Sequence, residues 1–276
     1  VKSLEVEQYD RITKPIENNK IISTKTKNVI DPEEFIYGST NLWDNAEIYS
    51  IPVSKLWQSE STNYQTISVR TMYNSKYIAI KMEWEDQTKD EVLYRVQDFQ
   101  DAAAIQFSID GVKGFHGMGS EDHPTDIWLW KAEWQLRTNN KTESDIALAY
   151  ANRVSDSEIE TYPKLMNDMA YLSGRDAGNI NSTANKTSPV ENVIAKGPQT
   201  VMSFPNSEQN VVGNGIWNGQ KWQVVFVRKL KSKSKQKVKI TKHNPIPIAF
   251  AIWNGIKEDR NGQKLVSTWY EIELKN

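Results

Sequence analysis

The fold is decided by the stretch Gln65-Thr-Ile-Ser-Val-Arg-Thr-Met-Tyr73, which is followed after Asn74-Ser75 by Lys76-Tyr-Ile-Ala-Ile-Lys-Met-Glu-Trp-Glu-Asp86. Apolar residues alternate with polar ones in both runs, and one face of the second run carries Ile78, Ile80, Met82 and Trp84. Period-two alternation on both sides of a short polar turn is typical of an antiparallel hairpin with one buried face. The stretch therefore predicts two neighbouring strands of a β-sheet.

The rest of the chain repeats this pattern in short apolar runs separated by turn residues. We expect further strands over residues 20–25, 49–54, 98–109, 127–136, 188–197, 200–204, 211–217, 221–230, 246–253 and 264–274. Asn218-Gly219 predicts the turn of a second hairpin. Many short strands with few long helical patterns favour one all-β domain over residues 1–276, an antiparallel β-sandwich.

One long segment departs from the strand pattern. Residues 138–188 are polar, rich in Asn, Ser, Asp and Thr, and contain one short helical candidate at residues 163–172. Long stretches of this kind inside compact domains are uncommon and usually functional. We therefore expect an excursion that covers a site or meets a partner.

Composition excludes several classes of function. The 34 basic and 35 acidic residues give a net charge of −1, so no global field attracts nucleic acid or an anionic membrane. These 276 residues include no cysteine, which excludes disulfides, thiolate metal sites and a c-type haem attached through CxxCH. No apolar run is long enough to span a membrane. The sequence does not begin with Met, which is expected after removal of a signal peptide and equally of a trimmed piece of a longer chain.

A basic run lies near the C-terminal end. Residues 229–242 include seven lysines, interleaved mainly with Ser, Gln, Val and Ile. Such a run is compatible with a solvated loop or an edge strand protected by lysine. A docking patch for an acidic partner is the alternative.

Motifs of enzymes are largely absent. The sequence has no GxSxG, P-loop, HExxH or EF-hand pattern. His116 and His123 could join Asp122 or Asp126 on a metal, but ordinary hydrogen-bonding loop histidines have the same spacing. Glu121 and Asp122 are equally generic as acid and base. No catalytic residue is predicted.

Met118 carries the clearest chemical signal. It lies between Gly117 and Gly119, ahead of the tryptophan-rich run Ile127-Trp-Leu-Trp130. Methionine is more often a core-filling residue than a ligand, but this loop setting is unusual for a core residue. Haem iron accepts a Met thioether, and the opposite axial position then needs a nitrogen donor, either His or a desolvated Lys.

A series of short motifs occurs along residues 44–274. They are Lys81-Met-Glu-Trp-Glu-Asp-Gln-Thr-Lys-Asp90, Phe99-Gln-Asp-Ala-Ala-Ala-Ile-Gln-Phe107, Met118-Gly119 followed by Pro124-Thr-Asp-Ile-Trp-Leu-Trp-Lys-Ala132, Ser188-Pro-Val-Glu-Asn-Val-Ile-Ala195, Trp222-Gln-Val-Val-Phe-Val-Arg-Lys-Leu230, Ala249-Phe-Ala-Ile-Trp-Asn-Gly255 and Arg260-Asn-Gly-Gln-Lys-Leu-Val-Ser-Thr-Trp-Tyr270. In this order they resemble the haem b-binding gamma subunits of periplasmic molybdenum oxidoreductases. That family includes ethylbenzene and dimethyl sulfide dehydrogenases, selenate and chlorate reductases, and the nitrite oxidoreductase of anammox-type bacteria.

The resemblance implies a site. Gamma subunits of this family are β-sandwiches that hold one b-type haem between axial Met and Lys ligands. Carried onto this sequence, the ligands are Met118 and Lys264, and the alternatives for the lysine are Lys131, Lys196 and Lys229. Without that role, Lys264 would be an exposed lysine at a strand edge.

The resemblance also implies a function. We expect a non-catalytic electron-transfer subunit that works with a molybdenum catalytic subunit, an iron–sulfur subunit and a soluble cytochrome. It would lie in the periplasm or an equivalent compartment such as the anammoxosome. The nitrite oxidoreductase gamma subunit can also carry a covalent c-type haem, which this cysteine-free sequence cannot hold.

Two other hypotheses stay open. One is a structural subunit, with or without haem, that joins nitrite oxidoreductase units into larger, tubular assemblies. The other is a carbohydrate-binding module, in which some of the ten tryptophans would form exposed sugar platforms instead of core.

Overall fold

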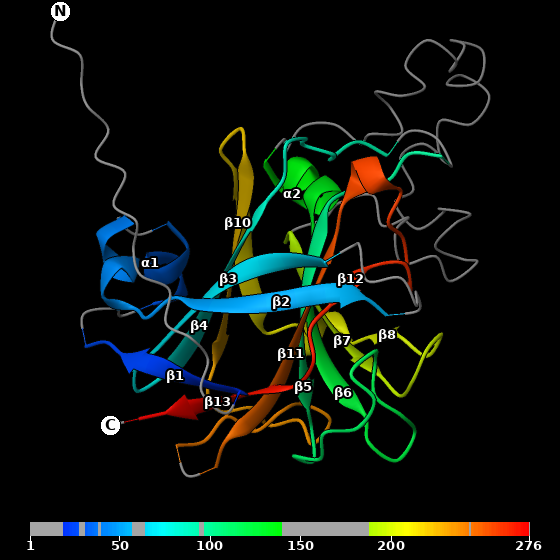
Figure 1. The fold of residues 1–276 in the computed structure, drawn as a ribbon. Helices are drawn as coiled ribbons and strands as arrows, with labels where there is room; N and C mark the ends of the chain where they lie inside the picture. Colours follow the sequence, from blue (N-terminus) through cyan, green and yellow to red (C-terminus); the bar gives the residue numbers. More distant parts are fainter. Residues whose placement is uncertain are drawn as a thin grey trace, which may run out of the picture.

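A computed structural model describes residues 19–27, 31–37, 40–56, 64–93, 97–139, 188–242 and 244–275. These residues form a mostly β structure with a few short helices (Figure 1). The all-β prediction is therefore confirmed. The expected helix at residues 163–172 and nearly all of the polar excursion lie outside the described residues.

Thirteen strands form one sheet: eleven follow the order β8-β7-β6-β5-β11-β12-β2-β3-β4-β10-β9, and β1 and β13 pair with each other off this path. Their bounds are β1 Lys20–Lys25, β2 Tyr49–Lys55, β3 Tyr64–Tyr73, β4 Tyr77–Glu85, β5 Ala102–Ser108, β6 Thr125–Lys131, β7 Val190–Ala195, β8 Met202–Ser203, β9 Val211–Trp217, β10 Lys221–Lys229, β11 Ile246–Trp253, β12 Leu265–Val266 and β13 Tyr270–Leu274. The helices are α1 Pro32–Tyr37 and α2 Ala132–Asn139, with 3-10 turns η2 Thr40–Asn45, η4 Asn206–Glu208 and η5 Gly255–Lys257.

Both predicted hairpins are present. β3 and β4 pair antiparallel, with Tyr73 opposite Ile78, and the Asn74 carboxamide oxygen accepts the backbone N–H groups of Lys76 and Tyr77, each at 2.8 Å. β9 and β10 pair antiparallel across a turn in which Gly219 has φ 97°. The asparagine side chains stabilise these tight turns locally, which explains why the sequence identifies them.

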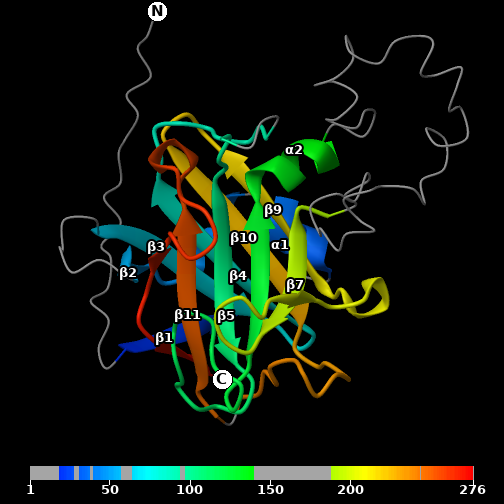
Figure 2. The ribbon, with the colours of Figure 1, turned by 90° about the vertical axis from the view of Figure 1, so that its right-hand side faces the viewer.

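The sheet is not wholly antiparallel. β1 runs parallel to both β13 and β3, whereas the other pairings are antiparallel. The strands curl over a shared core, with β4 and β10 facing β5, β6 and β11, so the sheet is mixed and barrel-like (Figures 1 and 2). The expected antiparallel sandwich is correct only in part. β1 pairs in parallel with both β13 and β3, and so connects strands that a two-sheet sandwich would leave unpaired.

Tryptophans fill the centre of this core. Trp84, Trp130 and Trp222 pack with ring centroids 4.8 to 6.5 Å apart. Of the ten tryptophans in the sequence, seven are buried in the structure: Trp43, Trp84, Trp128, Trp130, Trp134, Trp222 and Trp269. For these seven the core-packing interpretation is confirmed, and a sugar platform built from them is excluded.

The strand expected at residues 127–136 ends early. β6 stops at Lys131, and the Ala132 N–H donates to the carbonyl of Asp101 at 2.9 Å as helix α2 begins. The Gln135 carboxamide oxygen then accepts both the Trp130 indole N–H (3.1 Å) and the Gly215 N–H (2.8 Å). Trp134 therefore lies on a helix, because these contacts with distant residues stabilise the helical turn.

The last expected strand, residues 264–274, is interrupted. It divides into β12 and β13, and between them Ser267 exchanges hydrogen bonds of 2.9 Å with the backbone of Phe250. Among the described helices, none has the length and apolar character needed to cross a membrane.

Candidate functional site

A second apolar cluster lies on the outer face of β5, β6, β7 and β11, and we call it the outer patch. Side chains alternate along a strand, so Ala103 and Ile105 enter the main core whereas Ala104 faces outward. The patch contains buried Ala104, Ile127, Val193, Ala195, Ala251 and Val266, with partly buried Leu56, Met118, Leu129 and Trp253. Its three alanines, Ala104, Ala195 and Ala251, are small and buried.

Met118 borders this patch in a strained backbone conformation. Its φ is 131°, a region that favours glycine, and its side chain is half-buried. Conformations of this kind cost about 1–3 kcal/mol and persist where surrounding contacts impose them. The contacts here are hydrogen bonds from Gly197 N–H to the Met118 carbonyl (3.0 Å) and from Gly119 N–H to the Phe115 carbonyl (2.8 Å).

The two glycines beside Met118 are needed for space. A Cβ on Gly119 would lie 2.6 Å from the His123 carbonyl oxygen, and its φ is 71°. A Cβ on Gly117 would lie 2.6 Å from the Cδ2 atom of Leu56. The loop is therefore packed closely against its own return and against Leu56.

Two side chains from the sheet fix the loop. The Trp269 indole N–H donates to the Gly114 carbonyl at 2.6 Å, and the Gln106 carboxamide N–H donates to the His116 carbonyl at 3.2 Å. Trp269 precedes β13, and Gln106 lies on β5. The position of Met118 is thus set by elements from distant parts of the chain.

Lys264 is buried, not exposed at a strand edge. Its relative exposure is 7%, and its ammonium lies 4.9 Å from the Trp253 ring centroid. Among the described residues, none forms a hydrogen bond or ion pair with its side chain. Burial lowers the pKa of Lys264 to about 8, since desolvation disfavours the charged form.

Lys264 and Met118 meet the same outer patch. β12 pairs with β2 so that Leu265 is opposite Lys55, and one further step of this register places Leu56 opposite Lys264. Leu56 contacts the Met118 loop at Gly117, and Trp253 belongs to the patch that Met118 borders. Met118 and Lys264 therefore both border the outer patch, Met118 directly and Lys264 through Trp253.

The three alternative lysines differ from Lys264. Lys131 is half-buried, with its ammonium 4.5 Å from the Trp134 ring centroid. Lys196 and Lys229 are exposed. Lys264 is therefore the most desolvated lysine of the four.

The histidines and neighbouring carboxylates do not gather into a metal site. His123 Nδ1 lies 2.7 Å from Asp110, and Asp126 is fully buried against Arg228. His116 is half-buried, and burial lowers its pKa. Within the described part of the chain, no group of three His, Asp or Glu residues could hold a metal ion; His243 lies outside it.

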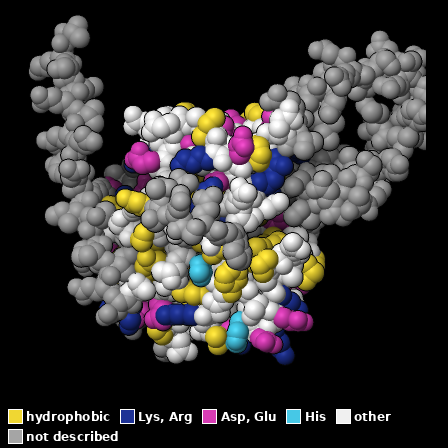
Figure 3. Space-filling model, turned by 45° about the vertical axis from the view of Figure 1, so that its right-hand side comes forward, with side chains coloured by type: hydrophobic (Ala, Val, Ile, Leu, Met, Phe, Trp, Pro, Cys, Tyr) yellow, Lys and Arg dark blue, Asp and Glu magenta, His cyan; other side chains and the backbone are white. Residues whose placement is uncertain are grey.

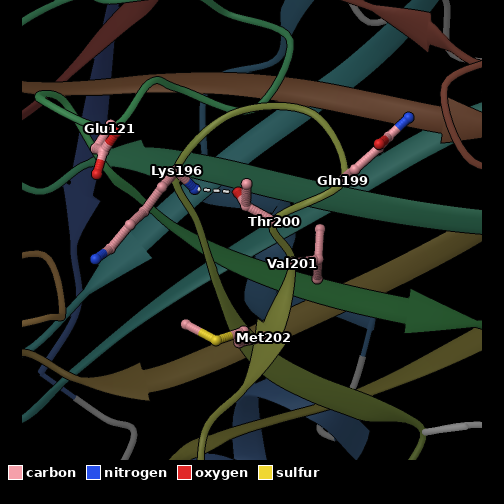
Figure 4. A pocket seen from close by; sticks show the side chains of 6 residues that line it. All are labelled: Glu121, Lys196, Gln199, Thr200, Val201 and Met202. Carbon is pink, nitrogen blue, oxygen red and sulfur yellow. Dashed lines mark hydrogen bonds between the residues drawn. The ribbon is translucent and has the colours of Figure 1, made fainter. Parts of the chain in front are cut away.

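An open recess of about 380 Å³ lies beside the Met118 loop (Figure 4). It is lined by Glu121, Lys196, Gln199, Thr200, Val201 and Met202. The turn between β7 and β8 forms most of its wall, and Lys196 N–H donates to the Thr200 hydroxyl at 2.7 Å there (Figure 4). Figure 3 shows hydrophobic side chains exposed near histidines on one face of the molecule.

Buried polar groups hold the segment that leads to Lys264, and they are not identified from the sequence. Asp101 accepts N–H groups from Gly255 (2.9 Å) and Trp222 (2.9 Å), and Asp86 accepts the Asn254 amide at 3.1 Å. Burial raises the pKa of Asp101 to about 7. These carboxylates come from other loops, Asp86 directly after β4 and Asp101 directly before β5. The one hint in the sequence is that the strand pattern stops at Asp86 and begins after Asp101.

Comparison with known proteins identifies the family. Residues 40–265 match the family described as ethylbenzene dehydrogenase. The chain belongs to this family. The resemblance stated from the sequence motifs is confirmed.

Three relatives of the chain are named as subunits of oxidoreductases. It is 22% identical over 239 residues to a candidate respiratory nitrate reductase heme subunit, ORF7, of Haloferax mediterranei, covering 85% of this chain and 66% of the relative. It is 21% identical to the chlorate reductase subunit gamma of Ideonella dechloratans (76% and 65%) and 25% identical to the dimethylsulfide dehydrogenase subunit gamma of Rhodovulum sulfidophilum (74% and 58%). The chain thus spans about two thirds or less of the length of these relatives.

A solved structure shares the fold. A candidate carbohydrate-binding protein from Bacteroides uniformis superposes with a TM-score of 0.52 at 8% identity, covering 93% of this chain and 99% of that one. At this identity the likeness concerns the fold alone.

The residues at the outer patch fit a haem. A thioether and a buried amine with a lowered pKa are both donors that haem iron accepts. The alanines and the Trp253 ring are apolar, which is the chemistry that a haem macrocycle requires of its surroundings.

Proposed function

We propose that this chain binds one haem b between Met118 and Lys264 and acts as a non-catalytic electron-transfer subunit of a molybdenum oxidoreductase. One observation carries the proposal. Lys264 is 7% exposed as a residue, its side chain lacks an acceptor among the described residues, and it lies beside Trp253 of the apolar patch that Met118 also borders.

The burial of a lysine without a hydrogen-bond partner lowers stability and therefore calls for an explanation. An isolated ammonium in an apolar setting is unfavourable, so the group tends to become neutral. The neutral amine exposes a lone pair, which is the form that binds a metal. Haem supplies the one-electron chemistry, and the protein supplies the ligands, the burial and the orientation.

The residues around the site support a fixed geometry. Gly197, Trp269 and Gln106 hold the loop of Met118 through backbone hydrogen bonds. Asp86 and Asp101 hold the segment before Lys264. If Met118 and Lys264 hold a haem, these contacts would keep both side chains in place, which suits a redox carrier.

The names of the relatives support the wider setting. They are subunits of nitrate reductase, chlorate reductase and dimethylsulfide dehydrogenase. We place this chain beside a molybdenum catalytic subunit and an iron–sulfur subunit, with a soluble cytochrome as its exchange partner. The complex would be of the nitrite oxidoreductase type and lie in the periplasm or the anammoxosome.

Haem titration tests the proposal. The protein purified without haem is titrated with haem b, and visible spectra are recorded for the wild type, Met118→Ala and Lys264→Ala. Met202→Ala and Lys257→Ala serve as matched controls, since both side chains are exposed. We expect a low-spin spectrum for the wild type and both controls, and an altered spectrum for each ligand variant.

Two results would contradict the proposal. The absence of a Soret band in the titrated wild type would show that the protein does not bind haem. A spectrum that stays low-spin and unshifted in Lys264→Ala would transfer the ligand role to another residue.

A further inference from the structure

The basic run, residues 229–242, is fixed to the rest of the fold by buried side chains. Its composition alone would suggest a solvated loop. Lys237, in its middle, is 1% exposed, and Val238 and Ile240 enter the main core. The Lys237 ammonium donates to the Glu208 carbonyl and to Asn210 Oδ1 (3.2 Å). It also lies 4.4 Å from the Phe204 ring centroid.

A buried ion pair between β6 and β10 also fixes this segment. Asp126 on β6 accepts the Val238 N–H at 2.9 Å and pairs with Arg228 at 2.9 Å. Arg228 also donates to the Val238 carbonyl at 2.7 Å. The backbone of the basic run is therefore attached to the start of β6, two residues beyond the end of the Met118 loop at Pro124.

The remaining six lysines of the run all face solvent, and we call them the lysine ridge: Lys229, Lys231, Lys233, Lys235, Lys239 and Lys242. Among the described residues, none forms an ion pair with a ridge lysine. The neighbouring carboxylates Glu271 and Glu273 on β13 already pair with Lys113 (2.6 Å) and Lys20 (2.5 Å). The ridge lysines thus have no ion-pair partner among the described residues, and the carboxylates that act on the buried Lys237 of the run are the buried Asp126 and the exposed Glu208.

Other exposed lysines extend the ridge around the turn between β3 and β4. Lys76 lies in this turn, and its carbonyl accepts the Leu230 N–H at 2.8 Å. Lys25 is paired with Tyr73, and the Lys242 ammonium is 5.5 Å from the Tyr73 ring centroid. The segment that carries the ridge, which joins β10 to β11, lies at the lower end of the molecule in Figure 1.

The chemistry of the ridge favours a protein over a nucleic acid or a membrane. The exposed large hydrophobic side chains of the structure lie elsewhere, so the described ridge offers no aromatic group for base stacking and no apolar group for membrane insertion. Its cations are all lysine, whereas arginine is the residue that recognises phosphate bidentately. Between residues 229 and 239 every second residue is a lysine, so the ridge carries a dense set of ammonium groups, which suits an array of carboxylates.

We propose that the lysine ridge docks the acidic face of a partner protein. The proposal does not depend on haem, because it concerns charges outside the outer patch. If haem is bound as proposed above, a partner on the ridge would lie next to the segment that carries Met118.

Binding of poly-L-glutamate tests this docking surface. The full chain is titrated with labelled poly-L-glutamate at about 20 mM and about 200 mM salt, where screening differs strongly. K233E/K235E reverses two ridge charges, and K89E/K257E reverses two exposed lysines outside the ridge. Single-stranded oligo-dT and vesicles of phosphatidylcholine with phosphatidylserine are titrated in parallel.

We expect poly-L-glutamate to bind at low salt, with at least tenfold weaker binding by K233E/K235E and less than about twofold change in K89E/K257E, since complementary patches dominate such association. No binding, or equal loss in both variants, would overturn the ridge as a docking surface. Tighter ridge-dependent binding of oligo-dT or of the vesicles would overturn the assignment to an acidic protein. Circular dichroism of the variants verifies that both remain folded.

Discussion

Two buried cations of this protein, Arg228 and Lys264, differ in their partners. Arg228 is 1% exposed, pairs with Asp126 at 2.9 Å, stacks 5.1 Å from Trp128 and donates to the Val238 carbonyl. Asp126 in turn accepts the amide of Asn192 at 2.6 Å. Lys264 is 7% exposed, and among the described residues its ammonium has the Trp253 ring beside it but no hydrogen-bond or ion-pair partner.

The difference in partners indicates a structural role for Arg228 and a functional role for Lys264. A buried charge whose hydrogen-bonding groups are all satisfied fixes neighbouring segments, and here it joins β6, β7, β10 and the lysine run. A buried charge without a partner reduces stability, so its presence favours a function that stability does not explain. The comparison leads to three predictions, from the largest expected effect to the smallest.

Removing the paired cation should have the largest effect. Arg228→Met leaves the Asp126 carboxylate buried without its counter-charge, which we expect to lower the free energy of unfolding by about 3–5 kcal/mol. Lys113→Met is the control, because its pair with Glu271 is exposed and worth about 1 kcal/mol or less. Urea denaturation measures both. A loss below about 1 kcal/mol in Arg228→Met would contradict a structural role for the pair.

Removing the unpaired cation, Lys264, should change the free energy of unfolding in the opposite direction. In protein without haem, Lys264→Met should raise the free energy of unfolding at pH 7 by about 1–3 kcal/mol, since the pKa of Lys264 falls on folding from 10.5 to about 8. Between these pH values the unfolded chain binds more protons, so wild-type stability rises with pH. The gain from Lys264→Met is therefore full below pH 8 and vanishes near pH 10.5.

Denaturation at several pH values tests this second prediction. Lys257→Met, at an exposed position, is the control and should change stability little. Destabilisation by Lys264→Met at pH 7 would mean that the ammonium has a favourable partner, and the contrast with Arg228 would fail.

The smallest effect concerns the ring beside Lys264. Trp253→Leu removes an aromatic face that stabilises the charged form by about 0.5–1 kcal/mol, so the pKa of Lys264 should fall further, by about half a unit. Trp253→Phe keeps a ring and should shift the pKa less. Side-chain NMR titration of the protein without haem follows the lysine directly. A rise of the pKa in Trp253→Leu would show that the ring does not favour the ammonium.

Local patterns in the sequence predicted much of the fold. The two hairpins follow from alternation and from turn asparagines, both of which act between near neighbours. The helix α2 was missed because its start depends on Asp101 and its Gln135 binds Gly215, and contacts of that range leave no periodic signal. The parallel pairing of β1 was missed for the same reason.

The site shows the same division. Met118 was singled out because its glycines and the following tryptophans are neighbours in the sequence, whereas Lys264 was named only through a resemblance. Its burial, the role of Trp253 and the support from Asp86 and Asp101 required the structure. The basic run was ambiguous until Lys237 proved to be buried.

The sequence by itself determined the strands, their turns, the tryptophan-rich core and the family, because period-two alternation and short motifs are local properties of the chain. Only the tertiary structure decided which buried cation is paired and which is not. Desolvation and pairing depend on residues that lie far apart in the sequence, such as Asp126 with Arg228 and Lys264 with Trp253.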